Sequence, residues 1–219
     1  MKNIKGYSTL VFDCDGVILN SNSVKTEALR QTAAQYGQTA ADNLVAYHKM
    51  HGGVSRYLKF DYLFREILAV SVDSAEVARL AEEFGSEVRD KLMTCEIASG
   101  LYKLRDFTAD AKWMVVSGGN QEELREIFKA REISKLFDGG IFGSPDPKEK
   151  ILAREMKSGN LVLPAVFIGD SEYDENAASG AGIDFIFLSG WSELFGWERF
   201  VQAHGLETHE RLIDLLGTC

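Results

Sequence analysis

Two carboxylates near the amino terminus are the first residues whose types and spacing suggest chemistry. Asp13 and Asp15 flank a single residue, and Gly16 follows them, directly after the apolar run from Thr9 to Phe12. Such a run is typical of a buried parallel strand, and ligands of open α/β sheets bind just beyond the carboxyl ends of strands. Two carboxylates this close repel each other and need a cation or a shared proton. The pair therefore predicts a magnesium site in which one carboxylate attacks a substrate and the other moves protons.

Three further predicted strands are followed by small or polar residues that suit phosphoryl transfer. These residues are Ser117-Gly118-Gly119 after the strand at 113–116, Lys148 after the strand at 140–143, and Asp170 to Asp174 after the strand at 165–168. In a parallel sheet, all of these loops lie at one edge. A nucleophile, a hydroxyl with free backbone amides, a lysine and an acid pair at one edge form the set of groups that phosphoryl transfer needs.

Hydrophobic periodicity divides the chain into two parts. Between 22 and 95 the spacing indicates helices at 24–36, 44–50 and 56–68 and from 73 onward, and it predicts no strand. Beyond 100, predicted helices at 101–107, 121–129, 148–157 and 173–181 alternate with strands, the last of which is at 184–188. This alternation predicts an α/β fold with a parallel sheet, in which the helical block is an insert. The segment from Leu206 onward is expected to be a closing surface helix.

The composition is that of a globular chain that binds neither nucleic acid nor membranes. A net charge of −9 and the lack of a long basic run argue against a partner bound through its phosphates. The amino terminus has no apolar signal segment and no run reaches membrane-spanning length, so a cytoplasmic protein is expected. Three cysteines are too few and too scattered for a disulfide framework or a zinc site, and Cys14 is expected to be a packing residue.

Together the motifs resemble those of the haloacid dehalogenase superfamily of phosphohydrolases. The resemblance rests on the segments 12–17 (FDCDGV), 116–119 (VSGG) and 169–174 (GDSEYD), and it extends from Val11 to Leu188. It implies a Rossmann-like α/β core formed by residues 1–21 and 96–219. It also implies a helical cap at 22–95, inserted after the first strand as in the phosphoglycolate phosphatase and β-phosphoglucomutase-like subgroup.

The resemblance implies a role for each matching residue at the sheet edge. Asp13 would be the nucleophile that forms an aspartyl-phosphate, because a carboxylate with a pKa of about 3.9 is ionised at neutral pH. Asp15 would be the general acid and base. Ser117 and the amide of Gly118 would hold the transferring phosphoryl group, and Gly16 is also assigned to substrate binding.

Mg²⁺ is the cofactor that the resemblance implies. Asp13 and Asp170 would bind it directly, and Asp15 would contribute its backbone carbonyl. Asp174 would bind the ion or orient its waters. This thin set of protein ligands suits Mg²⁺, which keeps several waters and takes one or two carboxylates plus phosphate oxygen.

A lysine is also needed to neutralise the phosphoryl oxygens and the charge of Asp13. Lys148 is assigned to this position because it follows a turn and opens the next helix, and Lys150 is the alternative. A lysine at the start of a helix opposes the helix dipole, which supports a functional role without choosing between the two.

Two residues of the implied cap are candidate substrate contacts. The segment 53–56 (GVSR) resembles the specificity segment of β-phosphoglucomutase-like members, in which an arginine grips the distal anionic part of the substrate. Arg56 is therefore a candidate, and a plain solvated helix residue is the alternative reading. Lys25 falls where related enzymes carry a histidine or lysine at the cap hinge. Weaker candidates, expected to be surface residues, are His48, His51 and Lys59.

The leading hypothesis is a Mg²⁺-dependent phosphatase acting on a small phosphomonoester, with a sugar or sugar-acid phosphate as the expected substrate. An acid at Asp15 argues against dehalogenation, because a leaving halide needs no proton. The stretch 47–56 does not match the lysine pattern of phosphonate-cleaving relatives. The alternatives are a β-phosphoglucomutase-like mutase and a non-catalytic sugar-phosphate-binding protein. A monomer or a homodimer is expected.

Overall fold

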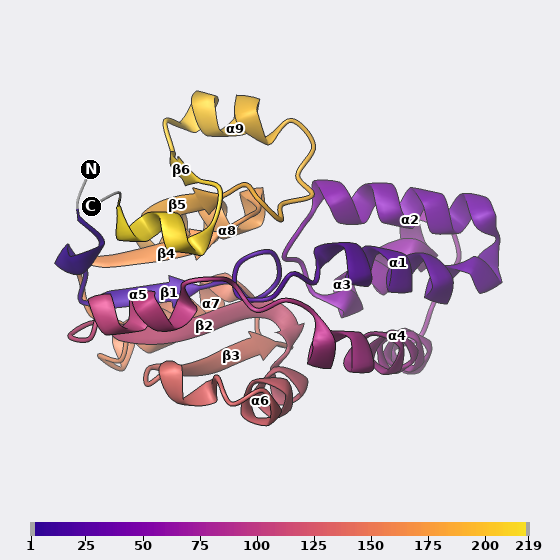
Figure 1. Cartoon of the computed structure of the whole chain (residues 1–219). Helices are drawn as coiled ribbons and strands as arrows, with labels where there is room; N and C mark the ends of the chain where they lie inside the picture. Colours follow the sequence, from indigo (N-terminus) through magenta and orange to yellow (C-terminus); the bar gives the residue numbers. More distant parts are fainter. Residues whose placement is uncertain (1–2, 218–219) are drawn as a thin grey trace.

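A parallel sheet of six strands lies at the centre of the computed structural model, which describes residues 3–217 (Figure 1). The strand order is β3-β2-β1-β4-β5-β6, and every neighbouring pair is parallel. The strands are β1 (Thr9–Phe12), β2 (Lys112–Asn120), β3 (Gly140–Ser144), β4 (Ala165–Gly169), β5 (Asp184–Leu188) and β6 (Glu207–His209). The predicted α/β fold is confirmed, and the strand that precedes the acid pair lies between β2 and β4.

The helices form two groups. Those between β1 and β2 in the chain are α1 (Asn22–Ala33), α2 (Gln38–Met50), α3 (Arg56–Tyr62) and α4 (Ser74–Thr94), with a π-helical turn at Leu63–Ile67 after α3. Those that follow are α5 (Leu101–Phe107), α6 (Gln121–Ala130), α7 (Lys148–Lys157), α8 (Glu172–Ala181) and α9 (Trp197–His204). We call α1 to α4 the helical insert. Within residues 3–217, no helix combines the length and the apolar character needed to cross a membrane.

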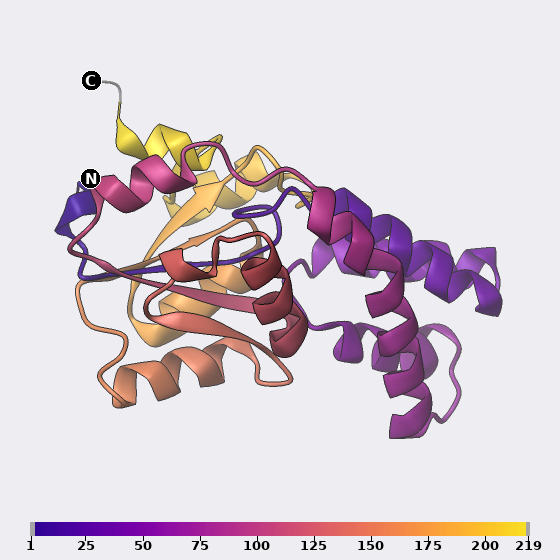
Figure 2. The same cartoon turned by 60° about the horizontal axis from the view of Figure 1, so that its bottom comes forward.

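Alternate side chains of the central strands pack into cores on opposite faces of the sheet. Leu10 and Phe12 belong to one apolar cluster and Val11 to the other, and all three are fully buried. This is the period-two alternation of a strand covered on both faces. Helices α5 and α6 contribute to the first cluster, whereas α7 and α8 contribute to the second. Figure 2 shows α5 and α7 on opposite sides of the sheet.

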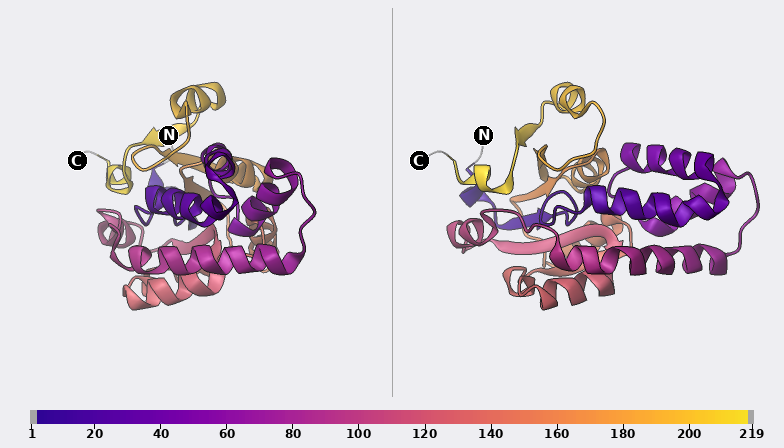
Figure 3. Two further views of the ribbon diagram at one scale, coloured as in Figure 1. Left: turned by 90° about the vertical axis from the view of Figure 1, so that its right-hand side faces the viewer. Right: turned by 45° about the vertical axis from the view of Figure 1, so that its right-hand side comes forward.

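The helical insert extends beyond the carboxyl ends of the strands, toward which the strand arrows point (Figures 1 and 3). Helices occupy the predicted insert, since α1 begins at Asn22 and α4 ends at Thr94. The two segments that connect it to the sheet lie side by side. The Asn20 amide donates to the Glu96 carbonyl at 2.9 Å, and the Ala98 amide donates to the Ile18 carbonyl at 2.8 Å. The insert is therefore joined to the sheet by a paired connection immediately after the acid pair.

The carboxyl-terminal segment differs from the prediction. The expected helix from Leu206 onward is wrong, because residues 207–209 form β6 and residues 212–216 form a 3-10 helix. The helix in this region is α9, which comes earlier in the chain. Leu212 and Leu215 are buried in the same apolar cluster as Leu101 and Leu104 of α5. Their apolar spacing thus reflects packing against α5 rather than one long surface helix.

Candidate active site

Adjacent parallel strands bring Asp13 and Asp170 to the same edge of the sheet. Asp13 follows β1 and Asp170 follows β4, and these strands pair in register, with Phe12 opposite Ile168. The Asp13 amide continues the ladder by donating to the Ile168 carbonyl at 3.0 Å. Both side chains are buried, with exposed fractions of 1% for Asp13 and 6% for Asp170. The sheet register therefore holds two acids together away from bulk water.

Lys148, the first residue of α7, is bonded to the acid that follows β1. Its exposed fraction is 1%, its Nζ lies 2.9 Å from Asp13 Oδ1, and it also forms an ion pair with Asp174. Burial acts to lower the pKa of Lys148, but the two carboxylates hold it above its ordinary value. Lys150 is exposed and bonds Asp146 at 2.7 Å. Of the two candidate lysines, the structure brings Lys148 to the acids.

Asp174 is fixed by the start of α8. Ser171 caps this helix, its Oγ lies 2.6 Å from Asp174 Oδ2, and the amide of Ser171 lies 3.2 Å from the same oxygen. Gly169 leaves the space for this arrangement, because a Cβ built there would be 2.4 Å from Asp174 Cβ. The Asp174 carboxylate thus bonds both the start of α8 and Lys148, so the backbone of α8 determines its position.

Three buried carboxylates could hold a metal ion. Each of Asp13, Asp170 and Asp174 offers an oxygen, and these oxygens lie within 4.8 Å of one another. Burial raises the pKa of Asp13 to about 7, with Asp174 and Asp15 adding to the rise against the opposing effect of Lys148. Burial and the neighbouring acids also raise the pKa of Asp170. The cluster therefore carries more negative charge than its surroundings stabilise.

The charge balance fits a divalent cation. Asp15 and the three clustered acids form four carboxylates, while Lys25 and Lys148 are the ammonium groups bonded to them. When all four carboxylates are ionised, two negative charges are left over, and an oxygen donor set of this kind is what Mg²⁺ prefers. The residues present thus fit the ion that the sequence predicts, with Asp13, Asp170 and Asp174 as its candidate ligands.

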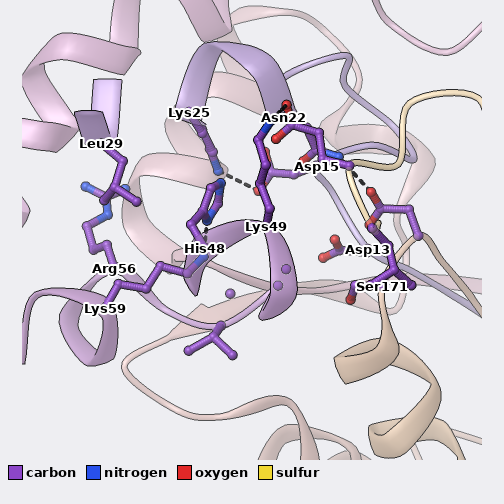
Figure 4. A pocket seen from close by; sticks show the side chains of 18 of the residues that line it. Asp13, Asp15, Asn22, Lys25, Leu29, His48, Lys49, Arg56, Lys59 and Ser171 are labelled. Carbon is purple, nitrogen blue, oxygen red and sulfur yellow. Dashed lines mark hydrogen bonds and ion pairs between the residues drawn. The ribbon is translucent and has the colours of Figure 1, made fainter. Parts of the chain in front are cut away.

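The side chain of Asp15 is bonded to Ser21, which precedes α1, and to Lys25 in the first turn of α1. Its Oδ1 accepts a hydrogen bond from Ser21 Oγ at 2.5 Å, and its Oδ2 lies 2.5 Å from Lys25 Nζ (Figure 4). Burial would raise the pKa of Asp15, but Lys25 and Ser21 together lower it below its ordinary value. The predicted acid is therefore held ionised by a lysine of α1, and it lies outside the metal-ligand cluster.

Ser117 and Gly118 lie where β2 passes beneath the helical insert. Ser117 is buried, and its Oγ accepts a hydrogen bond from the Gly119 amide at 3.1 Å. A Cβ built on Gly118 would lie 1.9 Å from the carbonyl oxygen of Gly53, which belongs to the loop between α2 and α3. Gly118 therefore permits a close backbone contact between the sheet edge and the insert.

Gly16 allows a second close contact, between its own backbone and the side chain of Asp170. Its φ is +76°, and a Cβ built there would lie 2.1 Å from Asp170 Oδ2. The same oxygen accepts a hydrogen bond from Asn22 Nδ2 at 2.7 Å. Gly16 thus makes room for Asp170 and does not line the cleft described next. Sequence reasoning missed the Asn22 contact, because Asn22 lies far from Asp170 in the chain.

A cleft between the sheet edge and the insert contains most of the predicted site residues (Figure 4). Residues from the sheet side include Asp13, Asp15, Gly118, Asp170 and Glu193, and residues from the insert include Lys25, His48, Gly53, Arg56 and Lys59. The expectation that Lys59 is a surface residue is wrong, since its exposed fraction is 5%. His48 is also half-buried, whereas His51 is exposed as expected. Cys14 is buried, in agreement with a packing role.

Arg56 already has a carboxylate partner. Its Nη1 lies 3.0 Å from Glu123 Oε1, its Nη2 pairs with the other oxygen of Glu123, and Nη1 also donates to the Ala81 carbonyl at 3.1 Å. The guanidinium is buried and ties α3 of the insert to α6 beside the sheet. Sequence reasoning missed Glu123. Its position in the first turn of α6 indicates only an acidic residue that stabilises the start of the helix.

Comparisons with known proteins identify the family. The chain belongs to the haloacid dehalogenase-like hydrolases, whose family model matches residues 7–182. A curated relative, the "phosphorylated carbohydrates phosphatase" of Thermotoga maritima, is 26% identical over 193 residues, which cover 81% of this chain and 83% of the relative. The predicted membership of this superfamily is confirmed, and the protein is therefore a hydrolase.

Solved structures share the fold. A haloacid dehalogenase hydrolase of family IA, variant 3, from Entamoeba histolytica aligns with a TM-score of 0.72 at 14% identity, covering 96% of this chain and 100% of that one. A predicted phosphoglycolate phosphatase from Haemophilus somnus aligns with a TM-score of 0.71 at 18% identity and covers 96% of both chains. At these identities the likeness concerns the fold.

The excess negative charge predicts that Mg²⁺ stabilises the protein. A ligand present at 100 times its Kd and bound only by the folded state adds about 2.7 kcal/mol, and each kcal/mol raises the Tm of a chain of this size by about 2–4 °C. Differential scanning fluorimetry with MgCl₂, against NaCl of equal ionic strength, should show this rise. Asp170→Asn should remove most of it, while Glu172→Gln, which changes an exposed acid of α8, should keep it. A rise of equal size in all three proteins would contradict a metal site at Asp170.

Proposed function

We propose that the protein is a Mg²⁺-dependent phosphatase that hydrolyses a small phosphomonoester through an aspartyl-phosphate on Asp13. The observation that carries the proposal is the position of Asp13, buried at the floor of the cleft between Lys148 and Asp170. A carboxylate nucleophile needs no base, but it needs cations that offset the charge of an approaching phosphoryl group. Lys148 supplies one, and Mg²⁺ held by Asp13, Asp170 and Asp174 would neutralise further charge on the phosphoryl oxygens.

In the first step, an oxygen of Asp13 attacks phosphorus while the bond from phosphorus to the leaving alcohol breaks. Asp15 gives its proton to the leaving oxygen. Lys148 stabilises the charge that spreads over the phosphoryl oxygens, and the amide of Gly118 is proposed to donate to one of them. Ser117 is proposed to orient this loop through its bond to the Gly119 amide.

In the second step, Asp15 takes a proton from water, and the oxygen of that water attacks phosphorus. The bond from phosphorus to Asp13 breaks, which releases inorganic phosphate, restores the Asp13 carboxylate and leaves Asp15 protonated for the next cycle. Asp15 can carry a proton in the first step only after Lys25 turns to another partner, because Lys25 lowers the pKa of Asp15. Binding of the substrate beside Lys25 is therefore proposed to prepare Asp15 for its role as an acid.

The helical insert is proposed to act as a cap, with residues 22–95 closing on a core formed by 1–21 and 96–219. Support comes from the Gly53 carbonyl, which lies against Gly118, and from the Arg56–Glu123 ion pair across the same boundary. A lid that closes on the site excludes water and completes the set of binding groups. Such a lid favours a small substrate over a protein.

A phosphorylated carbohydrate or sugar acid is the proposed substrate. The name of the relative from Thermotoga maritima supports this class, at an identity that leaves the individual substrate open to test. The sequence resemblance to β-phosphoglucomutase-like proteins makes a mutase the competing activity. Both activities would use Asp13, and they differ in whether the phosphoryl group ends on water or on a second hydroxyl.

Substitution of the nucleophile tests the proposal. With Mg²⁺ and p-nitrophenyl phosphate or a panel of sugar phosphates, Asp13→Asn should lower turnover by about 1,000-fold or more, because an amide cannot form the acyl phosphate intermediate. Asp110→Asn, which changes an exposed acid far along the chain, is the control. Retention of turnover in Asp13→Asn would refute the mechanism. Isomerisation of a hexose 1-phosphate without release of phosphate would identify a mutase instead.

Two neighbouring glycines test closure of the insert. In Gly118→Ala, the new methyl group collides with the backbone carbonyl of Gly53, so the insert cannot keep its position against the sheet edge. The value of kcat/KM should therefore fall by about 100-fold. In Gly119→Ala, the methyl group meets only the Leu124 side chain, at 3.3 Å, and the loss should be far smaller. Steady-state kinetics of both variants makes the comparison. Equal losses would show that the insert need not approach Gly118 during turnover.

A further inference from the structure

Lys59 differs from the other cations in or beside the cleft. Lys25 pairs with Asp15, Lys148 with Asp13 and Asp174, and Arg56 with Glu123. Within residues 3–217, Lys59 has no carboxylate at ion-pair distance, and its Nζ bonds only the Nδ1 atom of His48, at 2.6 Å. A buried ammonium group without a counter-ion is costly, so its retention in the wall of a cleft calls for a partner.

The surroundings of Lys59 favour an anionic partner. Burial lowers the pKa of Lys59 to about 7. The ammonium groups of Lys25 and Lys148 add to this effect, and the carboxylates of Asp15 and Asp13 oppose it without reaching ion-pair distance of Lys59. Burial and Lys59 also lower the pKa of His48. A neutral imidazole that accepts from Lys59 through Nδ1 carries its proton on Nε2, which makes it a second donor. An anion bound here would restore the charge of Lys59 and gain two donors.

The location separates this group from the phosphoryl site. Lys59 and His48 belong to α3 and α2 of the insert, whereas Asp13, Lys148 and Asp170 lie at the sheet edge. Asp13 and Asp170 line the same cleft as His48 and Lys59, and Figure 4 draws Lys25, His48 and Lys59 together on its insert side. Arg56, the residue to which the sequence assigned the distal anion, is bonded to Glu123 instead. A substrate phosphorylated at one end can therefore reach Lys59 with its other end.

We propose that Lys59 and His48 form a second anion-binding site, specific for a carboxylate on the part of the substrate that leaves as the alcohol. The inference rests on the proposed phosphatase activity and narrows its substrate class to phosphorylated hydroxy acids, such as sugar-acid phosphates. A carboxylate matches the site because one ammonium group and one imidazole N–H provide a single positive charge and two donors. Lys25 borders the same site, so a bound carboxylate also offers Lys25 a partner other than Asp15.

Matched substrates test the site. The pair 3-phosphoglycerate and glycerol 3-phosphate differ only in whether the distal group is a carboxylate or an alcohol, and 6-phosphogluconate and glucose 6-phosphate form a longer pair. The wild-type enzyme should prefer the acid of at least one pair by about 10-fold or more in kcat/KM. In Lys59→Met, kcat/KM for that acid should fall by about 10- to 100-fold, mainly through KM, while the neutral partner changes little.

Controls separate this site from folding and from the phosphatase activity itself. Lys91→Met changes an exposed lysine of the same insert and should keep the preference for the acid. The Tm of Lys59→Met should equal or exceed that of the wild type, because the substitution removes a buried charge without stranding a carboxylate. A bisphosphate such as fructose 1,6-bisphosphate, compared with fructose 6-phosphate, shows whether a second phosphoryl group is preferred instead of a carboxylate.

The possible failures are distinguishable. If p-nitrophenyl phosphate is hydrolysed in an Asp13-dependent way but neither acid is preferred, the second site is refuted and the phosphatase stands. If Lys59→Met lowers kcat/KM equally for the acid and the neutral substrate, Lys59 serves phosphoryl binding or packing and the inference fails. A preference for the bisphosphate alone would refute the carboxylate. If no phosphomonoester is hydrolysed, the proposed function itself fails.

Discussion

The buried ammonium group of Lys148 is the interaction on which the rest of the site depends. It lies between Asp13 and Asp174, and its surroundings exclude nearly all solvent. Without it, two buried carboxylates would face each other with no counter-charge, which is among the costliest arrangements in a protein interior. Asp13 follows β1, Lys148 begins α7 and Asp174 belongs to α8. The sheet and both helices must therefore be correctly placed for these charges to balance.

The negative charges of the acid cluster are not fully balanced, and the remaining negative charge explains the chemistry we propose. One lysine cannot offset Asp13, Asp170 and Asp174, which leaves room for a divalent cation and for a phosphoryl group drawn to both cations. On the other side of the cleft the excess has the opposite sign, because Lys59 lacks a carboxylate among residues 3–217. A substrate with a phosphoryl group at one end and a carboxylate at the other would complement both sides at once.

The sequence predicted the strands of the sheet well because each apolar run ended in a loop of small or polar residues, as at Phe12 and Asp13. It missed β6, since three residues of an edge strand carry no periodic signal and depend on pairing with β5. It assigned the phosphate-site lysine to Lys148 but left Lys150 as an alternative, because the rotation of α7 about its axis is set by packing. Lys59 was expected at the surface because lysines are rarely buried. The pairing of Arg56 with Glu123 could not be predicted, because the two residues are 67 positions apart in the chain.

The central claim is that Asp13 carries the phosphoryl group during turnover. The most direct test is peptide mapping by mass spectrometry after an acid quench of the Asp15→Asn variant during turnover of p-nitrophenyl phosphate with Mg²⁺, because the p-nitrophenolate leaving group needs no proton from Asp15. Loss of the general base should slow release of the phosphoryl group, so the intermediate should accumulate. The account predicts phosphate on the peptide that contains Asp13, and none when Asp13 is replaced by Asn. Phosphate on another residue, or hydrolysis with no phosphorylated peptide at any time, would contradict it.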